Sequence, residues 1–133
     1  MKKCTKSIGD FGEGIAADFY IKEGYKIRER NYHHSHNEID IIAENERFVV
    51  FVEVKTRSVL YVGSGNFGRP ASSVDYEKQK RTVAAAQNYI IKNKLNKQPR
   101  IDVVEVYLKK KETDEDTPIE VLKINHIRNA FGR

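Results

Sequence analysis

The pattern of apolar and polar positions predicts a helix followed by three strands in the first half of the chain. Residues 8–23 form the predicted helix, with Ser7 or Asp10 as its N-cap and Gly24 at its end. Residues 25–32 alternate apolar and polar side chains, which is typical of a half-exposed strand. The runs "EIDIIA" and "RFVVFVEVKT" flank the short polar segment "ENE", a pattern that predicts a β-hairpin.

The second half of the chain predicts one long helix and one or two further strands. Residues 75–94 are amphipathic, and the side chains expected on the inner face are Val83, Ala86, Tyr89 and Ile90. Pro99 separates this helix from the strand "RIDVVEVYL", and a last strand is expected near "IEVLKI". A helix that joins two strands implies a right-handed crossover and a parallel pair. The prediction is therefore an α/β protein with a mixed sheet flanked by helices.

Length and composition narrow the class of protein. A chain of 133 residues, 39% apolar and 32% charged, fits one globular domain over residues 1–133. No apolar run approaches the roughly 18 residues that a membrane helix needs, and no apolar segment follows the first lysines, so we expect neither membrane partner nor secretory signal. The single cysteine, Cys4, excludes an internal disulfide and a cysteine-based zinc site within one chain, and it suits the cytoplasm.

Three charged side chains lie inside the apolar runs of the predicted hairpin: Asp40, Glu53 and Lys55. Charged side chains are seldom buried in a protein unless they are paired or hold a metal. Side chains two apart on a strand share a face, so Glu53 and Lys55 point the same way. A short hairpin can place Asp40 beside Glu53 on that side of the sheet. Two carboxylates that close repel each other unless a cation or a proton lies between them.

These charges have two interpretations. Asp40 and Glu53 can hold a hard cation such as Mg²⁺, with Lys55 placed to steady a phosphate or a developing hydroxide. Alternatively, Lys55 forms a structural ion pair with one of the acids at the end of the sheet, since charges in strands often protect an edge. The trio favours the site, because buried ion pairs are weak evidence for stability and functional sites collect them.

The spacing of Asp40, the hairpin and Glu53-Val54-Lys55 resembles the Asp…Glu-x-Lys motif of the PD-(D/E)XK nuclease superfamily. The segments "GEGIAADFYIKEGYKIRERNY", "NEIDIIA", "VFVEVKTR" and "RIDVVEV", with the helix near "EKQKR", resemble the YraN-like family of small bacterial proteins. They occur in family order over about residues 9–108. That family is assigned to the nuclease fold near archaeal Holliday-junction resolvases, so the resemblance implies a restriction-endonuclease-like fold.

The resemblance also implies roles for single residues. Asp40 and Glu53 would hold Mg²⁺ or Mn²⁺, with the Val54 carbonyl as a further ligand, and Lys55 would orient or activate the attacking water. In resolvase-like relatives a glutamate of the first helix approaches the metal, and Glu13 in "GEGIAAD" resembles it. The alternative for Glu13 is an interaction with the helix dipole.

Residues beside the motif carry weaker expectations. Glu38 shares the strand face of Asp40, yet it can equally be a solvated charge at the strand end. Asn37 stands where the family usually has glycine, and Asn tolerates the positive φ that such a turn needs. Farther along, Asp102 is expected to serve the structure of its strand end, with Arg100 as its partner.

Basic residues supply candidate contacts to nucleic acid. The formal net charge of +5 favours anionic partners, and it matters most where basic residues gather beside a site. Lys78 and Arg81 lie three apart at the start of the second helix and so share a face. Arg57 directly precedes the glycine-containing loop 58–74, and Arg69 lies within it. All four are candidate phosphate contacts, and the alternative for the helix pair is an ordinary solvated face.

Two further motifs are interpreted as structural. "GSGNFG", residues 63–68, fits the G-x-G-x-x-G pattern, but Arg69-Pro70 follows it in place of a helix, which excludes a dinucleotide fingerprint. The histidines of "HHSH", residues 33–36, can bind transition metals. No other soft ligand lies in sequence reach, so we expect exposed histidines at a strand end.

Three functions are carried forward. The first is a metal-dependent phosphodiesterase acting on branched or broken DNA. The second is a nucleic-acid-binding module without the chemistry, and the third is an interaction protein with a basic surface. The complete set of Asp40, Glu53 and Lys55 favours the enzyme, because a pure binder need not keep a like-charge pair. Resolvase-like relatives are dimers, so a homodimer is a candidate assembly.

Overall fold

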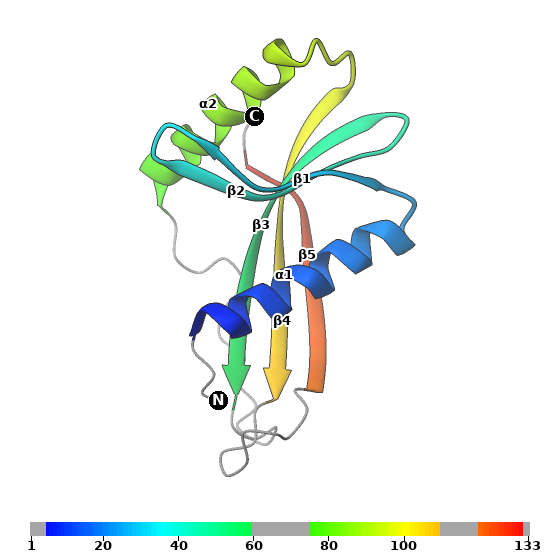
Figure 1. Cartoon of the computed structure of the whole chain (residues 1–133), viewed down its shortest axis with the longest axis vertical. Coiled ribbons are helices and arrows are strands. Elements are labelled where there is room, and N and C mark those ends of the chain that lie inside the picture. Colours follow the sequence, from blue (N-terminus) through cyan, green and yellow to red (C-terminus); the bar gives the residue numbers. More distant parts are fainter. Residues whose placement is uncertain (1–4, 60–74, 110–119, 132–133) are drawn as a thin grey trace.

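The computed structural model describes residues 5–59, 75–109 and 120–131, which form an α/β fold of two helices and five strands. In chain order the elements are α1 (Thr5–Lys22), β1 (Lys26–His34), β2 (Asn37–Glu44), β3 (Phe48–Val59), α2 (Tyr76–Lys92), β4 (Gln98–Lys109) and β5 (Glu120–Phe131). Figure 1 shows them as one sheet with a helix on each face. The predicted fold class is confirmed, and neither helix in these ranges is long and apolar enough to cross a membrane.

The sheet is mixed, with the strand order β1-β2-β3-β4-β5. β1, β2 and β3 form an antiparallel meander, and β5 pairs antiparallel with β4. β3 and β4 run parallel, with Glu53 opposite Val103 and Lys55 opposite Glu105. The parallel pair follows from the sequence, because α2 connects the two strands. The helix returns the chain to the end of the sheet where β3 began, so β4 starts there and runs in the same direction.

Alternation of apolar side chains along β3 lets the two helices cover opposite faces of the sheet. Val50 and Val52 pack toward α1, in a cluster that includes Ala16, Ala17, Tyr20, Ile41, Val104 and Val106. Val49 and Phe51 pack toward α2, in a cluster that includes Ile42, Ala85, Ala86, Tyr89 and Ile101. The predicted inner face of α2 is confirmed: two of its residues are buried, and Val83 and Ile90 pack against the same cluster.

The sheet divides at one point, which we call the fork. The β2–β3 ladder runs from Glu44 opposite Val49 to Ile41 opposite Val52. Beyond Ile41, β2 turns away from β3 toward the start of α2 (Figure 1). The fork therefore lies between Asp40 on β2 and Glu53-Val54 on β3. At the fork, backbone groups of β3 can bond to side chains in place of β2.

Several predicted boundaries are corrected by the structure. α1 begins at Thr5, ahead of Ser7 and Asp10, so neither is its cap. Gly24 does follow the end of α1, with a φ of 94° that suits glycine. The predicted loop 58–74 begins too early, because β3 continues to its pairing of Val59 with Lys109; residues 60–74 lie outside the described part.

Two turns and strand ends also differ from the prediction. The left-handed residue of the β1–β2 turn is Ser35, with a φ of 58°, and not Asn37. Asn37 is instead buried at the start of β2, where its amide donates to Thr82 Oγ1 at 3.4 Å. The last strand extends beyond "IEVLKI" to Phe131, because residues of the segment 125–131 continue to pair with β4 through one irregularity in register, between Ile101 and Val103.

Candidate functional site

Asp40 lies at the fork, where β3 is no longer paired with β2. Its side chain bonds to the β3 backbone at that point. Its carboxylate accepts a hydrogen bond from the Val54 backbone N–H at 2.8 Å. Burial raises the pKa of Asp40 to about 6, and the Val54 hydrogen bond opposes that shift. The carboxylates of Glu13, Glu53 and Glu38 raise the Asp40 pKa further. Acids from α1, β2 and β3 thus all act on the Asp40 carboxylate. The motif named Asp40 and Glu53 as a pair, and the family resemblance added Glu13.

Glu53 is held by two lysines from different elements. Its Oε2 atom accepts a hydrogen bond from Lys78 Nζ at 2.9 Å and lies 3.4 Å from Lys55 Nζ. The Lys55 and Lys78 side chains are 30% and 41% exposed, so both ammonium groups can be reached from solvent. The structural ion pair proposed as an alternative is therefore present, and α2 contributes a second cation to the same carboxylate.

Glu13 approaches the fork because α1 packs closely against β3. A Cβ atom on Gly12 would overlap the Thr56 side chain, so only glycine permits this distance between helix and strand. Glu13 Oε1 accepts a hydrogen bond from Asn31 Nδ2 at 3.1 Å. Asn31 has a φ of 54°, a left-handed conformation that Asn tolerates. The contact with β1 fixes Glu13 more specifically than the helix dipole would.

The donor atoms at the fork suit a hard cation by their chemistry. Asp40, Glu53 and the Val54 carbonyl offer oxygen ligands, and Mg²⁺ is usually bound by one or two carboxylates with water and phosphate completing its shell. Within the described ranges, no three His, Cys, Asp or Glu side chains are grouped to hold a metal. The donor set that the resemblance implies is thus one of two carboxylates, Asp40 and Glu53, whereas the Glu13 carboxylate is engaged by Asn31.

The four basic side chains that the sequence suggests as phosphate contacts have different surroundings. Lys78 is turned inward onto Glu53, as described above, whereas Arg81 is exposed on the next turn of α2. Arg57 follows Lys55 on the same face of β3, and its Nη2 lies 3.5 Å from Glu105 Oε2. Arg69 lies outside the described residues.

The sequence interpretation missed Glu105, a fully buried acid on β4. Its Oε1 accepts hydrogen bonds from Asn125 Nδ2 at 2.8 Å and from the Tyr107 hydroxyl at 3.3 Å. It lies opposite Lys55 in the β3–β4 register, so it continues the row of polar side chains on the face of the sheet that carries Glu53 and Lys55. A charge inside the apolar run "RIDVVEVYL" was the available signal, and it is the same signal that identified Asp40.

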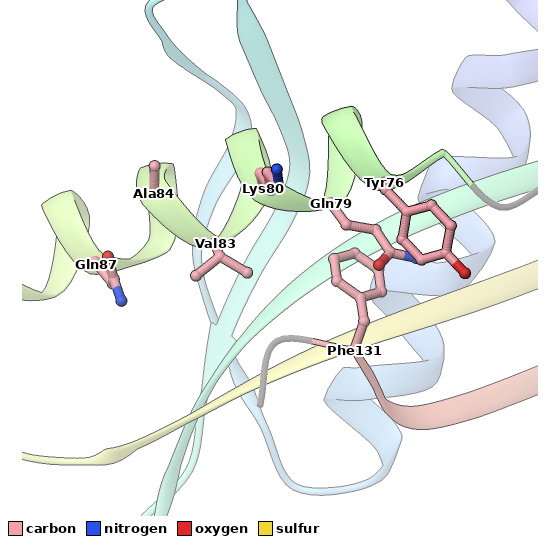
Figure 2. A pocket seen from close by; sticks show the side chains of 7 residues that line it. All are labelled: Tyr76, Gln79, Lys80, Val83, Ala84, Gln87 and Phe131. Carbon is pink, nitrogen blue, oxygen red and sulfur yellow. The ribbon is translucent and has the colours of Figure 1, made fainter.

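A groove lies between α2 and the end of β5, and we call it the α2–β5 groove (Figure 2). Its volume is about 340 Å³, and its lining includes Tyr76, Gln79, Lys80, Val83, Gln87 and Phe131. A smaller pocket of about 90 Å³ adjoins it and shares Val83, Gln87 and Phe131. No sequence pattern pointed to it, because Tyr76 and Phe131 lie far apart in the chain and meet only in the fold.

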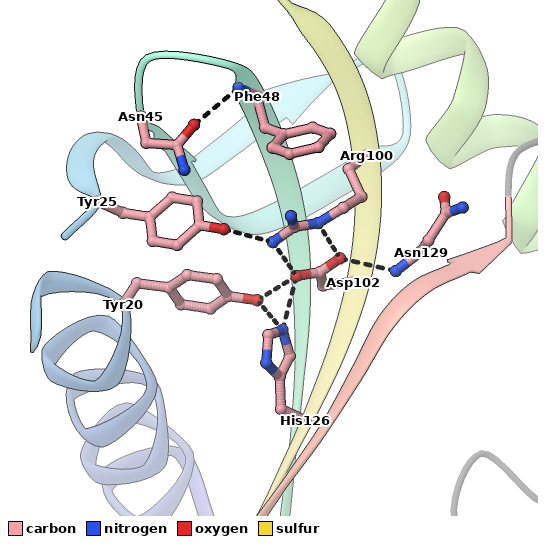
Figure 3. Close-up of polar contacts among 8 residues, drawn as sticks. All are labelled: Tyr20, Tyr25, Asn45, Phe48, Arg100, Asp102, His126 and Asn129. Carbon is pink, nitrogen blue, oxygen red and sulfur yellow. Dashed lines mark hydrogen bonds and ion pairs between the residues drawn. The ribbon is translucent and has the colours of Figure 1, made fainter. Parts of the chain in front are cut away.

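A separate buried network surrounds Asp102 on the α1 side of the sheet (Figure 3). Arg100 donates to both Asp102 oxygens at 3.0 Å, which confirms the predicted partner. The remaining contacts come from Tyr20 Oη at 2.7 Å, His126 Nε2 at 2.7 Å and the Asn129 N–H at 2.9 Å. Burial opposes ionisation, but these hydrogen bonds outweigh it and hold the pKa of Asp102 well below its usual range. The network joins α1, β4 and β5.

Comparison with known sequences identifies the family. Residues 12–106 match the family described as "Uncharacterised protein family UPF0102". The chain belongs to the UPF0102 family. A UPF0102 protein of Clostridioides difficile (strain 630) is 46% identical over 128 residues, which cover 96% of this chain and 98% of the relative. A UPF0102 protein of Caldanaerobacter subterraneus subsp. tengcongensis is 46% identical over 133 residues, covering 98% and 100%. A third, from Clostridium botulinum (strain 657 / Type Ba4), is 41% identical over 133 residues, covering 98% of each chain.

Proposed function

We propose that this UPF0102 protein is a metal-dependent phosphodiesterase of the PD-(D/E)XK type that cleaves DNA, with branched or broken duplexes as its substrates. The observation that carries the proposal is Asp40, which is half-buried at the fork. Its carboxylate is held by the Val54 N–H at 2.8 Å, and the carboxylates of Glu13, Glu53 and Glu38 lie near enough to raise its pKa. Like charges at close range are costly without a cation between them. A fold that keeps them at the open end of a sheet therefore favours a cation site over a structural role.

Each side chain at the fork has a role in this proposal. Asp40 and Glu53, with the Val54 carbonyl, would hold Mg²⁺ or Mn²⁺. The Val54 N–H orients the Asp40 carboxylate, because its 2.8 Å hydrogen bond occupies one oxygen and leaves the other for a ligand. When bound, the metal would supply charge neutralisation at the phosphate and a more acidic attacking water.

Lys55 is the group proposed to act on the transition state. Its ammonium lies 3.4 Å from Glu53 Oε2 and is partly exposed, so it can turn toward a phosphate without leaving the site. A cation placed there orients the attacking water and stabilises the charge that develops on the phosphate oxygens. Glu13 is proposed to tune this site through its field on Asp40, because its own carboxylate is engaged by Asn31.

DNA is the proposed partner because basic side chains extend from the fork in two directions. Lys78 and Arg81 lie along α2, and Arg57 lies along β3 on the face that carries Glu53 and Lys55. Such groups hold phosphate without reading sequence. The chain's net charge of +5 adds a general attraction to polyanions.

A second candidate function is a nucleic-acid-binding module without catalysis. It is favoured by the contacts of Glu53, whose Oε2 is already neutralised by Lys78 and Lys55. An internally paired glutamate does not require a metal. Within the described residues the lack of a three-acid metal group fits this second candidate as well.

Cleavage assays with Lys55→Ala and Glu53→Ala test the proposal. Lys55→Ala keeps both carboxylates, so DNA affinity should stay near that of the wild type while the single-turnover cleavage rate falls at least roughly a hundredfold. Glu53→Ala should also abolish cleavage, but high Mn²⁺ should restore part of it, because this variant loses metal affinity in the ground state. Lys26→Ala, which removes an exposed lysine on β1, is the matched control and should change neither quantity.

The substrate panel comprises single-stranded, duplex, flap and four-way DNA, each with Mg²⁺, Mn²⁺ or EDTA at fixed salt. The proposal predicts cleavage that depends on the metal and is strongest on a branched substrate. If wild-type protein binds DNA of the panel but cleaves none of it with either metal, the proposed nuclease activity is wrong. The function is then that of a nucleic-acid-binding module.

A further inference from the structure

We propose that the α2–β5 groove is a nucleobase subsite, which takes an unpaired base of the nucleic acid strand whose phosphate lies at the fork. The inference rests on the proposed function in one respect: nucleic acid is the molecule engaged there. It adds a substrate class, a strand with a single-stranded segment.

Two aromatic rings from distant parts of the chain border the groove. Tyr76 comes from the first turn of α2 and Phe131 from the end of β5, and Figure 2 shows both rings with Gln79 beside them. Tyr76 is 70% exposed, so its ring is not needed for the core. Exposed aromatic side chains are the surfaces on which unpaired bases stack, independently of sequence.

The polar lining matches a base better than an apolar peptide. Gln79 and Gln87 carry amides that can both donate to and accept from the edge of a base. Lys80 is the charged residue of the lining, and no carboxylate of the described residues lines the groove. A cation with no opposing acid complements a ligand that carries phosphate.

The groove lies next to the fork on the same helical turns. Lys78 faces one flank of α2 and contacts Glu53 at 2.9 Å, whereas Tyr76 and Lys80 line the groove on the other flank. An α-helix is only about 10 Å across with its side chains, so the two surfaces are separated by the width of one helix. A strand that crosses the start of α2 can therefore meet both.

The size of the groove fits a single small group. Its volume of about 340 Å³ lies at the lower end of small-ligand sites, which hold roughly 300–1,000 Å³. Val83 and Ala84 give it an apolar wall against which a flat ring can lie.

The test measures binding of a short single-stranded oligonucleotide that contains the fluorescent base 2-aminopurine, with a blunt duplex as the comparison. Tyr76→Ala should weaken single-strand binding at least about fivefold, the low end for loss of one stacked base, and should remove the fluorescence quenching that stacking produces. Tyr76→Phe keeps the ring and should bind as the wild type does. Duplex affinity should change less than twofold in both variants.

Two exposed residues at the far end of α2 supply matched controls. Ile91, which is 75% exposed, controls for the loss of an apolar side chain, and Lys92 controls for Lys80. Ile91→Ala and Lys92→Ala should leave single-strand binding unchanged, whereas Lys80→Ala should weaken it. Because Tyr76 is largely exposed, its variants should keep the wild-type unfolding midpoint, which is measured alongside.

The outcomes separate this inference from the proposed function. If Tyr76→Ala binds and quenches the labelled strand as Ile91→Ala does, while wild-type protein cleaves DNA, the subsite is wrong and the nuclease stands. If quenching requires Tyr76 but no DNA is cleaved, the subsite stands and the nuclease fails. If Tyr76→Ala changes only the sedimentation of the protein, the groove is an interface between copies of the chain, and the subsite is wrong.

Discussion

Asp40 lies half-buried near other carboxylates, so its ionised form costs free energy in the metal-free protein. Its hydrogen bond from Val54 offsets only part of that cost, since the pKa is still raised to about 6. A carboxyl with a raised folded-state pKa stabilises the fold at pH values below the unfolded pKa. That contribution is lost as the pH rises through the folded value. Stability and the proposed metal site therefore make opposite demands on this residue.

Asp40→Asn should stabilise the metal-free protein at pH 8, because it removes a half-buried charge and keeps an oxygen for the Val54 N–H. We expect the free energy of unfolding to rise by about 1–2 kcal/mol, with the gain shrinking below pH 6 and vanishing below pH 4. The measurement is urea unfolding in EDTA across this range. Glu46→Gln, an exposed acid in the β2–β3 turn, is the control and should stay within about 0.5 kcal/mol.

The same variant gives an independent check on the metal. Added Mn²⁺ should raise the unfolding midpoint of the wild type and leave that of Asp40→Asn unchanged, because binding to the folded state alone stabilises it. An Asp40→Asn protein that is less stable than the wild type at pH 8 would mean that the Val54 contact outweighs the repulsion. The central premise of the site would then be wrong.

At the scale of elements, α1 is positioned by one glycine and one polar network. Gly12 allows α1 to contact Thr56 of β3, and this contact brings Glu13 to the fork. At its other end, Tyr20 anchors α1 to Asp102 of β4. Between these two points the apolar cluster beneath α1 supplies area but no specific register.

Gly12→Ala should destabilise the protein although alanine favours helices. The new methyl group overlaps Thr56, so α1 must shift, and overpacking of this kind costs about 1–3 kcal/mol. Gly9→Ala is the matched control, because a Cβ there meets no atom within 4 Å and should stabilise α1 by roughly 0.5–1 kcal/mol. The measurement is thermal unfolding of both variants. Equal stabilisation by both would show that α1 does not pack this closely.

Asp102→Asn should test the network that joins α1, β4 and β5. It leaves the buried Arg100 without its counter-charge, so we expect a loss of about 3 kcal/mol at pH 7. The pKa of Asp102 is lowered by its partners, so its contribution is present above the unfolded pKa of about 3.9 and is lost as the pH falls below it. The difference from the wild type should therefore narrow at pH 3. The measurement is urea unfolding at both pH values.

The control for this network is Asp18→Asn, which alters an exposed acid on α1 and should have little effect. A difference between wild type and Asp102→Asn that stays constant from pH 7 to pH 3 would contradict the proposed charge pairing. It would assign the effect of the substitution to packing.

At the scale of the whole molecule, the net charge of +5 should make DNA binding depend on salt. We expect the logarithm of the affinity to fall with the logarithm of salt concentration by about 0.9 per phosphate contacted. Arg81→Ala should reduce that slope by about one and weaken all sequences alike. Lys22→Ala, at the exposed end of α1, is the control. Salt-independent binding, or none, would favour a protein partner instead.

The structure makes Arg81 a cleaner choice than Lys78 for this titration. The sequence predicts both residues as phosphate contacts, but in the structure Lys78 is paired with Glu53. Its removal would change the proposed metal site as well as the surface charge. The sequence alone could not make this distinction. It places Lys78, Lys80 and Arg81 near the start of a helix, but their spacing does not indicate which side chain contacts the sheet.

The sequence by itself determined the helices, the strands, the parallel pair and the motif of Asp40, Glu53 and Lys55. These depend on local periodicity and on the short hairpin, which act between residues close in the chain. Only the tertiary structure decided that β2 leaves β3 at Asp40, that Lys78 returns to Glu53, and that Tyr76 meets Phe131. The same holds for the contacts of Glu105 with Asn125 and of Asp102 with Tyr20, which join elements far apart in the chain. Pairings between distant segments follow from how the sheet twists and divides, and no periodicity along the chain records that.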